Sequence, residues 1–494
     1  MALEITFEPG EPPKRATAAY SSLPELSAPF LIDPAHRSYK HQYANIYFVR
    51  LIELRPIVEE RAAERWKNVR GRPPLLPRIL NLQRGQLCYI VGTIYMDMKL
   101  KPSILEDMSG PAGIAPPERP KFFSSQDSVH LEDESGRVRL VGDVIRKERM
   151  RADGGIVTGC VMAALGLETG NGDFEVVDLC FAGLPDLYRP ETNGDAKGKA
   201  KASDAMDVDD DGHGNGATKE KTWVACVSGL SIGTESTIPD LKAQLLVEWL
   251  MGEDGGPADQ LEGARVARVI FAGNSLAAPV KEDRKPKPRF SHTNDPSAAA
   301  HPSKTLSTLI GDLLSSSLPV NLVPGPTDPA GALLPQQPLP KVMLGGKKAE
   351  GLECSTNPGW FQVGDRSFLV TGGQNINDLF KYLPGQSRLR MARRTLELRH
   401  VAPTAPDTLW IYPFPDTDPF ILRHRPEVYV IGNQPEFETA VVGGAATPTR
   451  LILLPSFAET GTVALVCLET LEVKTMGFEV PSWAGDVKDV KPAV

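Results

Sequence analysis

A polar stretch near the middle of the chain constrains the fold more than any other feature of the sequence. Residues Asp186–Thr222 read DLYRPETNGDAKGKAKASDAMDVDDDGHGNGATKEKT and contain almost no large apolar side chains. Such a stretch cannot offset the entropy lost on ordering by burying apolar surface, so we predict a disordered linker over residues 186–222. The 494 residues of the chain suffice for two or three domains. We therefore treat the two halves separately and assign residues 1–40 to an N-terminal tail.

The first half, residues 41–185, has the pattern of a helix followed by an all-β domain. Short runs rich in branched and aromatic residues recur at Leu87–Met96, Ser128–Asp143 and Gly155–Ala182, with ESG and GNG as hairpin turns. This spacing predicts a small β barrel or sandwich. Ahead of it, Gln42–Trp66 has a helical rhythm of apolar positions that Pro56 breaks once.

The second half, residues 223–494, alternates between strand and helix patterns. A buried strand at Thr222–Leu230 precedes an amphipathic helix at Ile238–Met251 and a second buried strand at Arg265–Asn274. Repeated units of this kind predict a layered α/β domain. A polar stretch at 281–304 is expected to be a disordered surface insertion within it. Another helix and five more strands are expected from Leu306, Leu309, Ile310, Leu313 and Leu314 on one helical face, and from the runs 319–325, 366–373, 426–433, 450–457 and 462–478.

Small-residue loops follow the central strands of this second domain, and they read SGLSIG, AGNS, PGPTDP, TGGQN and IGNQP. In open α/β sheets, a site lies in the crevice outside the carboxyl ends of the strands. The order of these strands resembles the calcineurin-like phosphoesterase fold, in the degenerate form carried by the B subunits of replicative DNA polymerases. Active phosphoesterases of this fold place D-x-H, G-D, G-N-H-D/E, a His and G-H-x-H in these loops, where they hold two metal ions that activate water.

The corresponding loops here lack those ligands. They read Ser228-Gly229-Leu230, Gly273-Asn274, Gly325-Pro326-Thr327-Asp328, Gly372-Gly373-Gln374-Asn375 and Gly432-Asn433-Gln434-Pro435, without a histidine. The bridging carboxylate of the family becomes the neutral amide of Asn274. Since clustered cations need anionic and imidazole donors, we expect no catalytic residue, no metal ligand and no cofactor site.

Longer phrases resemble the delta-type members of the B-subunit family. They include QYANIYFVRL, KPSIL, LEDESGRVRLVGD, LLPQQPLP, TNPGW, GGQNINDLFKY and VYVIGNQPEF, and the most specific is RHVAPTAPDTLWIYPFPDTDPFIL at Arg399–Leu422. The resemblance implies that the first domain is an OB fold packed against an inactive phosphoesterase-like domain. It also implies a nuclear, non-catalytic scaffold that links the C-terminal metal-cluster domain of a polymerase catalytic subunit to a third, smaller subunit. The alternatives are an active metal-dependent phosphodiesterase or nuclease, and the B subunit of another replicative polymerase.

Composition limits the other partners. The formal charge of −8 argues against bulk DNA binding, so a DNA contact is expected to be weak or indirect at most. The six cysteines lie far apart without a CxxC pair, which disfavours a zinc site or disulfide framework. No run is long enough to span a membrane, and the first residues do not resemble a signal peptide. The basic cluster Lys281, Arg284, Lys285, Lys287 and Arg289 fits a nuclear import signal and a solvated loop equally well.

Three further candidates have structural interpretations that we prefer. His400 closes a basic helix, so we favour a charge partner for the helix dipole over a catalytic base. Asp416 and Asp418 in PDTDPF are better explained as turn residues than as paired carboxylates. An OB fold can stack single-stranded bases on aromatic rings, but aromatic residues in short strands usually belong to the core. We expect core positions for the candidate rings Tyr89, Tyr95, Phe174 and Phe181.

Overall fold

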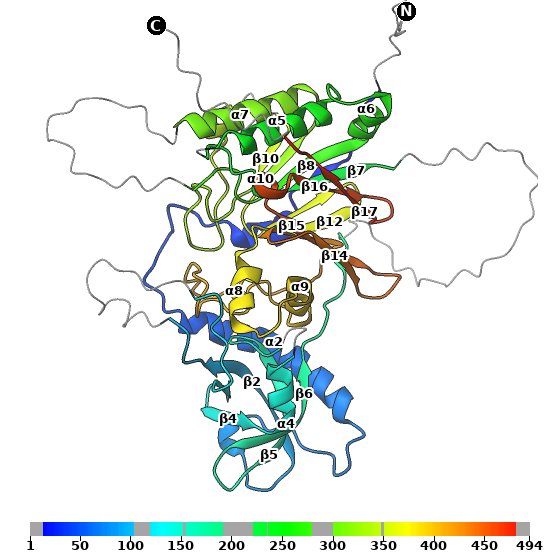
Figure 1. Ribbon diagram of the computed structural model, residues 1–494. Coiled ribbons are helices and arrows are strands. Elements are labelled where there is room, and N and C mark those ends of the chain that lie inside the picture. The colour runs from blue at the N-terminus through cyan, green and yellow to red at the C-terminus, as the bar shows by residue number, and fades with distance from the viewer. Residues whose placement is uncertain are drawn as a thin grey trace, which may run out of the picture.

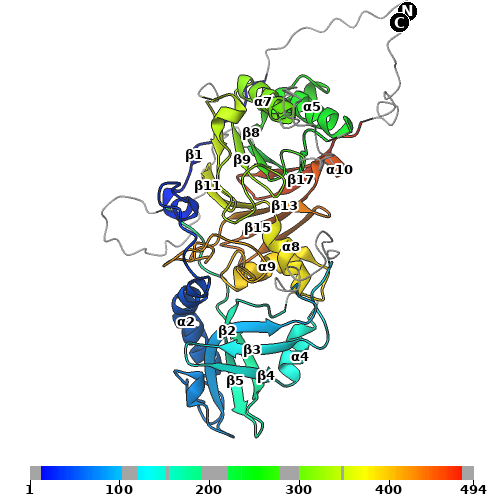
Figure 2. The same ribbon diagram turned by 90° about the vertical axis from the view of Figure 1, so that its left-hand side faces the viewer.

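The computed structural model describes residues 13–102, 119–151, 155–190, 221–234, 236–278, 300–346 and 350–480. A β barrel forms one end of the molecule, and two stacked sheets lie beyond it (Figure 1). Helices α5 (Ile238–Met251), α6 (Pro257–Ala264) and α7 (Ala300–Ser315) cover the far sheet. Helices α8 (Gln374–Tyr382) and α9 (Arg388–Glu397) lie between the near sheet and the barrel, as Figure 2 also shows.

The barrel has the strand order β2-β3-β4-β6-β5 and closes through the pairing of β5 with β2. Antiparallel pairs form most of it, and a parallel pair between β4 and β6 completes the ring. This connectivity is that of an OB fold, and the predicted all-β first domain is confirmed. Its elements are β2 (Cys88–Asp97), β3 (Ser128–Glu132), β4 (Arg137–Val141), α4 (Asp143–Arg149), β5 (Val161–Glu168) and β6 (Phe174–Phe181), with a 3-10 turn at Ile79–Asn81.

Helix α2 (Ala44–Trp66) runs along the barrel as a single element. Its buried face carries Ile46, Leu54 and Val58, which recur at helical spacing against the cores of both domains. The break expected at Pro56 is wrong, because the helix continues through it. Pro56 and Ile52, four residues earlier, both lie on the exposed side, so the carbonyl that loses its N–H partner faces solvent.

Two six-stranded sheets form the second domain, in the orders β10-β9-β8-β7-β16-β17 and β1-β11-β12-β13-β15-β14. The central strands β7, β8 and β9 of the first sheet pair in parallel, as do β12, β13 and β15 of the second. Each is an almost continuous apolar run because layers cover both of its faces. The predicted layered α/β domain is confirmed.

The bounds of these strands and of the short helices are as follows. The first sheet contains β7 (Trp223–Val227), β8 (Val266–Ala272), β9 (Val320–Val323), β10 (Leu352–Cys354), β16 (Thr462–Cys467) and β17 (Val473–Gly477). The second contains β1 (Tyr20–Ser21), β11 (Gly359–Val363), β12 (Arg366–Thr371), β13 (Val428–Gln434), β14 (Glu438–Val442) and β15 (Thr449–Pro455). The short helices are α1 (Pro24–Ser27), α10 (Phe457–Thr460) and the 3-10 turns Ala28–Phe30 and Lys341–Leu344.

The N-terminal segment is more than the tail that we expected over residues 1–40. From Arg15 onward it packs along the second domain, and β1 extends the edge of a sheet by pairing with β11. The guanidinium of Arg15 donates to the Leu250 carbonyl at 2.6 Å, and Phe30 is only 2% exposed. Its apolar residues are spaced too irregularly to predict an element from periodicity, which explains why the sequence did not indicate this packing.

The predicted linker and insertion lie mostly outside the described residues. Residues 191–220 and 279–299 are not described, and the basic cluster Lys281–Arg289 falls in the second gap. The linker prediction began too early, because Tyr188 is 8% exposed and its N–H donates to the Arg425 carbonyl. The predicted insertion extended too far, because α7 begins at Ala300.

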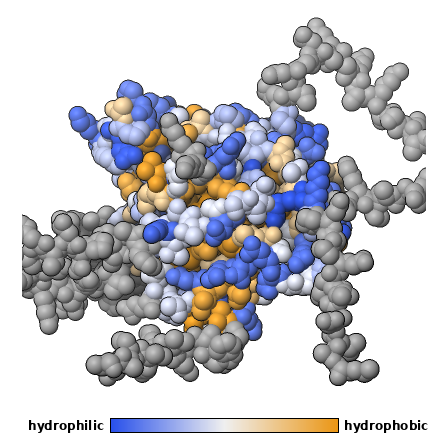
Figure 3. Space-filling model, turned by 90° about the horizontal axis from the view of Figure 1, so that it is seen from above, coloured by the Kyte–Doolittle hydropathy of each residue, from blue (hydrophilic) through white to orange (hydrophobic). Residues whose placement is uncertain are grey.

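One apolar core passes from the barrel into the second domain. It contains Ile94 and Leu131 of the barrel together with Ile376 of α8 and Leu453 of β15. At the opposite end, seen from above in Figure 3, hydrophobic side chains show between hydrophilic ones over α5–α7, where Leu241 and Leu261 are among the exposed apolar residues. Within the described parts of the chain, no helix is both long and apolar enough to cross a membrane.

Candidate functional site

The carboxyl ends of β7, β8, β9, β12 and β13, together with the loops that follow them, meet where the two sheets face each other. The Asn433 N–H donates to the Ser228 hydroxyl at 2.8 Å, and the Asn433 side-chain amide donates to the Gly372 carbonyl at 2.9 Å. The Thr327 N–H donates to Asn274 Oδ1 at 3.1 Å. The sequence therefore predicted correctly which strand ends converge. We call these loops the strand-end loops.

The strand-end loops are tight, and two of their asparagines adopt the left-handed backbone conformation. Asn274 has φ of 54° and Asn433 has φ of 52°. Asparagine tolerates this region better than most residues, because its short polar side chain bonds locally. At Gly432 the constraint is steric and not conformational, because a Cβ atom there would lie 2.0 Å from the Ala272 carbonyl oxygen. The close approach of β13 to β8 therefore excludes any side chain at this position.

Asp328 is an acidic residue of these loops, and backbone N–H donors surround its carboxylate. Its carboxylate accepts the N–H groups of Gly325 at 2.8 Å and Leu276 at 2.9 Å, and that of Ser275 at 3.3 Å. Burial raises the pKa of Asp328, and the backbone hydrogen bonds oppose that shift. The carboxylate thus ties the loop after β9 to the loop after β8, and both oxygens are already engaged.

A network of side-chain amides fills the space beside Asp328, and the sequence did not predict it. Gln336 Oε1 accepts from Asn357 Nδ2 at 2.9 Å and from Gln374 Nε2 at 2.8 Å, while Gln336 Nε2 donates to the Gly325 carbonyl at 2.9 Å. Asn357 Oδ1 accepts the Gly372 N–H at 3.0 Å. Gln336 lies in LLPQQPLP and Asn357 in TNPGW, so the phrases that carried the family resemblance supply these partners.

The residues present do not fit a two-metal centre. Active members of the fold use carboxylates and imidazoles, whereas amides and hydroxyls converge here and hydrogen-bond one another. Nowhere in the described ranges do three or more His, Cys, Asp or Glu residues group as metal ligands. Asn375, which the sequence placed in the fourth loop, lies in the first turn of α8 and is directed elsewhere, since its Nδ2 donates to the Val401 carbonyl and to the Tyr429 hydroxyl. The Asp328 carboxylate is already engaged by backbone N–H groups, so the described residues of these loops offer no free anionic donor to repay the dehydration of two divalent cations.

His400 and Asp418 form a buried cluster with Arg50 at the contact between the domains. The Arg50 guanidinium donates to Asp418 Oδ2 at 2.9 Å, and His400 Nε2 lies 2.9 Å from the same oxygen. All three side chains are at most 1% exposed. Arg50 also donates to the carbonyls of Gly159, Pro403 and Ala405, so it bridges α2, the barrel and the second domain.

The ionisation of this cluster contradicts the helix-dipole role predicted for His400, whereas Asp418 takes part in the predicted turn. Burial and the nearby charge of Arg50 lower the pKa of His400 to about 4, so the imidazole is neutral near pH 7. It cannot act as a charged partner of the helix dipole, and that prediction is wrong. Although burial opposes it, His400 and Arg50 lower the pKa of Asp418. Asp418 does form the predicted turn, through the Phe420 N–H, while Asp416 is exposed.

The four aromatic candidates of the barrel have different surroundings. Phe174 is fully buried, and Tyr89 is 8% exposed against Trp66, so both are core residues as predicted. Phe181 lies at the domain contact, with the Arg394 guanidinium 4.0 Å from its ring centre. Tyr95 is a partly exposed surface residue rather than a core residue, and the Arg137 guanidinium lies 4.3 Å from its ring centre.

Comparison with known families and proteins agrees with this architecture. The family described as DNA polymerase delta subunit OB-fold domain matches residues 42–179, which include the barrel. The family described as the DNA polymerase alpha/epsilon B subunit matches residues 224–439, which include all five strand-end loops. The two matches therefore cover both domains.

Relatives from distant organisms are similar along nearly the whole chain. The DNA polymerase delta small subunit of Oryza sativa subsp. japonica is 36% identical over 94% of this chain and 98% of its own length. The protein of the same name from Arabidopsis thaliana is 36% identical over 88% and 91%. That from Saccharomyces cerevisiae is 31% identical over 95% and 96%. With both domains matched in full-length relatives, the chain belongs to the family of DNA polymerase delta small subunits.

Proposed function

We propose that this chain is a non-catalytic scaffold subunit of a nuclear DNA polymerase delta. It holds the C-terminal metal-cluster domain of the catalytic subunit on one surface and a third, smaller subunit on another. Its contribution is binding energy and geometry, and it makes no chemical bond. Contact with DNA is weak or indirect, in keeping with the net charge of −8.

The observation that carries the proposal is the hydrogen-bonded state of the strand-end loops. A hydrolytic site needs open coordination positions and a water that a metal can activate. Here the Asn433 amide donates to the Gly372 carbonyl, and the Asn274 amide oxygen accepts the Thr327 N–H. Both side chains stand where the fold's active members place metal ligands, and both are used internally. The crevice therefore stabilises the domain instead of holding a substrate.

Exposed apolar side chains on α2 support a binding role. Phe48 is 53% exposed and Ile52 is 54% exposed, and their spacing of four residues places them on one side of the helix. Before α2 begins, Tyr39 packs edge-on against Tyr412, and Trp410, two residues from Tyr412 in the sequence, is 65% exposed. Aromatic and apolar side chains exposed in this way are typical of a protein interface. This surface lies at the junction of the two domains.

The first test is enzymatic. The purified chain is incubated with bis(p-nitrophenyl) phosphate and with single-stranded DNA in the presence of manganese, magnesium or zinc. No turnover above buffer is expected. Turnover that is lost in Asp328→Asn would return the chain to the phosphoesterases and refute the proposal.

The second test is assembly. The chain is co-expressed with the C-terminal domain of the catalytic subunit and with the third subunit, and the three are expected to co-purify. Phe48→Asp combined with Ile52→Asp should reduce recovery of a partner, because two carboxylates would have to be buried in the interface. Val441→Asp is the matched control, since Val441 is 51% exposed on the edge strand β14. Failure of the wild-type chain to retain either partner would contradict the scaffold role.

A further inference from the structure

The turn that joins β14 to β15 carries a sequence feature that the scaffold role does not use. Residues 443–448 read GGAATP and lie between the two strands. Thr447-Pro448 is the only place in the 494-residue sequence where a serine or threonine is followed directly by proline. A hydroxyl residue directly before a proline is the acceptor that proline-directed protein kinases recognise.

The turn is open to an enzyme. Residues 443–446 are exposed, and Thr447 and Pro448 are half-buried. A Cβ atom at Gly444 would meet no other atom within 4 Å, so this side of the turn faces open space. The Thr447 N–H donates to the Gly444 carbonyl at 3.0 Å, whereas Pro448 has no N–H to donate to the ladder. A short turn of small residues, with few packed side chains, opens locally at a low cost in free energy.

A buried arginine lies directly behind the Thr447 hydroxyl. Arg425 Nη2 donates to Thr447 Oγ1 at 2.8 Å, and Arg425 Nη1 donates to Thr449 Oγ1 at 3.1 Å. Arg425 Nε donates to the Pro185 carbonyl at 2.9 Å, and the residue is only 5% exposed. These hydrogen bonds use three of the five guanidinium N–H groups, and all three acceptors are neutral oxygens.

The charge of Arg425 is not matched by a contacting anion. Among the described residues, no carboxylate lies within ion-pair distance of Arg425, whereas the buried Arg50 is paired with Asp418. Burial lowers the pKa of Arg425, and the charge of the exposed Asp186 opposes that shift from beyond ion-pair distance. Buried charges are normally paired. An anionic group on Thr447 would supply the partner that Arg425 lacks.

We propose that Thr447 is a phosphorylation site for a proline-directed protein kinase and that its phosphate pairs with Arg425. In the transfer, Thr447 Oγ1 attacks the γ-phosphorus of ATP. The new O–P bond replaces the bond from that phosphorus to the oxygen that bridges to the β-phosphate, ADP leaves, and the hydroxyl proton passes to the base of the kinase. The phosphate carries a charge of about −1.5 to −2 at pH 7, and the planar guanidinium matches its geometry.

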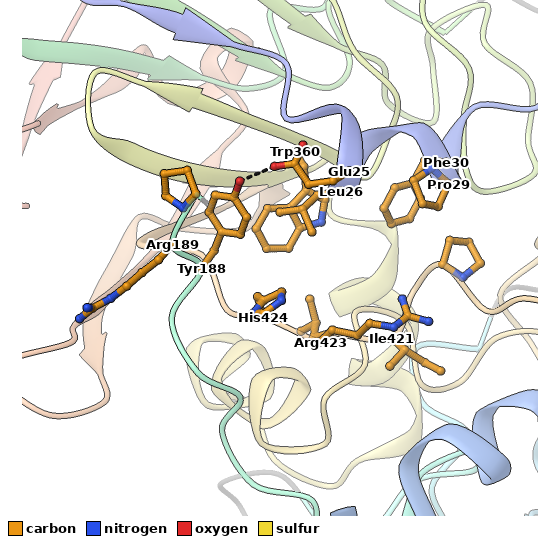
Figure 4. A pocket seen from close by; sticks show the side chains of 13 residues that line it. Glu25, Leu26, Pro29, Phe30, Tyr188, Arg189, Trp360, Ile421, Arg423 and His424 are labelled. Carbon is orange, nitrogen blue, oxygen red and sulfur yellow. Dashed lines mark hydrogen bonds between the residues drawn. The ribbon is translucent and has the colours of Figure 1, made fainter. Parts of the chain in front are cut away.

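This pairing would fasten the turn to the stretch of chain that leaves the barrel. The Arg425 N–H donates to the Asp186 carbonyl at 2.9 Å, and the Arg425 carbonyl accepts the Tyr188 N–H at 2.9 Å. Figure 4 shows Tyr188 of this stretch beside His424, with the two ring centres 6.0 Å apart. Phosphorylation of Thr447 therefore converts a neutral hydrogen bond at this contact into a charge-assisted one, which is stronger.

Labelling tests the site. The full-length chain is incubated with ATP and a purified mitogen-activated protein kinase, which is proline-directed, and the products are analysed by intact-protein and peptide mass spectrometry. We expect one phosphoryl group on each chain, at Thr447. Thr447→Ala and Pro448→Ala should each abolish it, whereas Thr470→Ala is the matched control, because Thr470 is exposed but precedes leucine. No incorporation into the wild-type chain, or full incorporation into Thr447→Ala, would overturn the assignment.

Phosphorus-31 NMR tests the pairing with Arg425. The second pKa of a phosphate ester is about 6, and a neighbouring guanidinium lowers it by favouring the dianion. We expect the pKa of the phosphate on the wild-type chain to be lower by about 0.5 or more than that of the peptide GGAATP phosphorylated at its threonine. In phosphorylated Arg425→Gln, the pKa should return to that of the peptide. Equal values in the wild-type chain and the peptide would overturn the pairing, and this comparison holds even if Arg425→Gln does not fold.

The inference is independent of the scaffold function. If the three subunits co-purify while Thr447 takes up no phosphate, the phosphorylation inference fails and the scaffold function stands. If Thr447 is phosphorylated while no partner co-purifies, the scaffold function fails and the phosphorylation site stands.

Discussion

Replacing Asp418 with asparagine tests the buried cluster at the domain contact. The change keeps the size of the side chain but leaves the Arg50 guanidinium without its carboxylate, 2.9 Å away in the native chain. Removing one partner of a buried ion pair costs about 3–5 kcal/mol, because the other charge stays buried without a counter-ion. Arg50 would still donate to the carbonyls of Gly159, Pro403 and Ala405. These bonds favour the lower part of that range.

The magnitude converts to a melting temperature. About 400 described residues, at roughly 2.1 cal/mol/K each, give an unfolding entropy near 0.8 kcal/mol/K, so the midpoint should fall by about 4–6 °C. Differential scanning calorimetry of the full-length chain measures it. Asp416→Asn is the matched control, because Asp416 lies two residues away and is exposed.

A double variant and the Asp416→Asn control test whether the ion pair between Arg50 and Asp418 causes the shift in melting temperature. Arg50→Met in the Asp418→Asn background should lower the midpoint by less than the sum of the two single changes, since the removed groups interact directly. A shift below about 1 °C in Asp418→Asn, or an equal shift in Asp416→Asn, would refute the role assigned to the cluster.

Three further results are expected. On folding, the pKa of His400 falls from 6.5 to about 4, so between these pH values the unfolded chain binds a proton that the folded chain does not. The free energy of unfolding therefore decreases as the pH falls from 6.5 toward 4. Urea unfolding of His400→Gln should show a smaller decrease over the same pH range. Gly432→Ala should destabilise by about 1–3 kcal/mol through the clash with the Ala272 carbonyl, whereas Gly444→Ala, which meets nothing within 4 Å, should not. Asn433→Asp should cost about 1–3 kcal/mol in the same assay, because it sets a carboxylate against a carbonyl oxygen, and an unchanged midpoint would contradict the amide network.

The parts of the fold that the sequence predicted are those with a regular pattern. Apolar runs such as Val266–Ala272 have the length of a doubly covered strand, and Leu306, Ile310 and Leu313 recur at helical spacing on α7. The loops after such strands must lie at one edge of their sheets, so the convergence of Ser228, Asn274 and Asp328 followed from topology.

The remainder depends on contacts between residues far apart in the sequence. Gln336 and Asn357 reach the strand-end loops only because two irregular segments fold over them, and no periodicity marks either one. The burial of Arg50 could not be predicted for a different reason. A charged residue on a helix normally faces solvent. Only the distant Asp418 and three backbone carbonyls make its burial tolerable.

The shared core sets the mechanical character of the molecule. Ile94 of the barrel and Ile376 of α8 belong to one continuous set of packed side chains, and Arg50 fastens the same junction through 368 residues of sequence separation from Asp418. Such a junction behaves as a strut and not as a hinge, because bending it would open buried apolar surface. Two proteins attached to its opposite ends would keep a fixed spacing and orientation. Each protein would therefore have a higher effective concentration at the other than it would on a flexible tether of the same length.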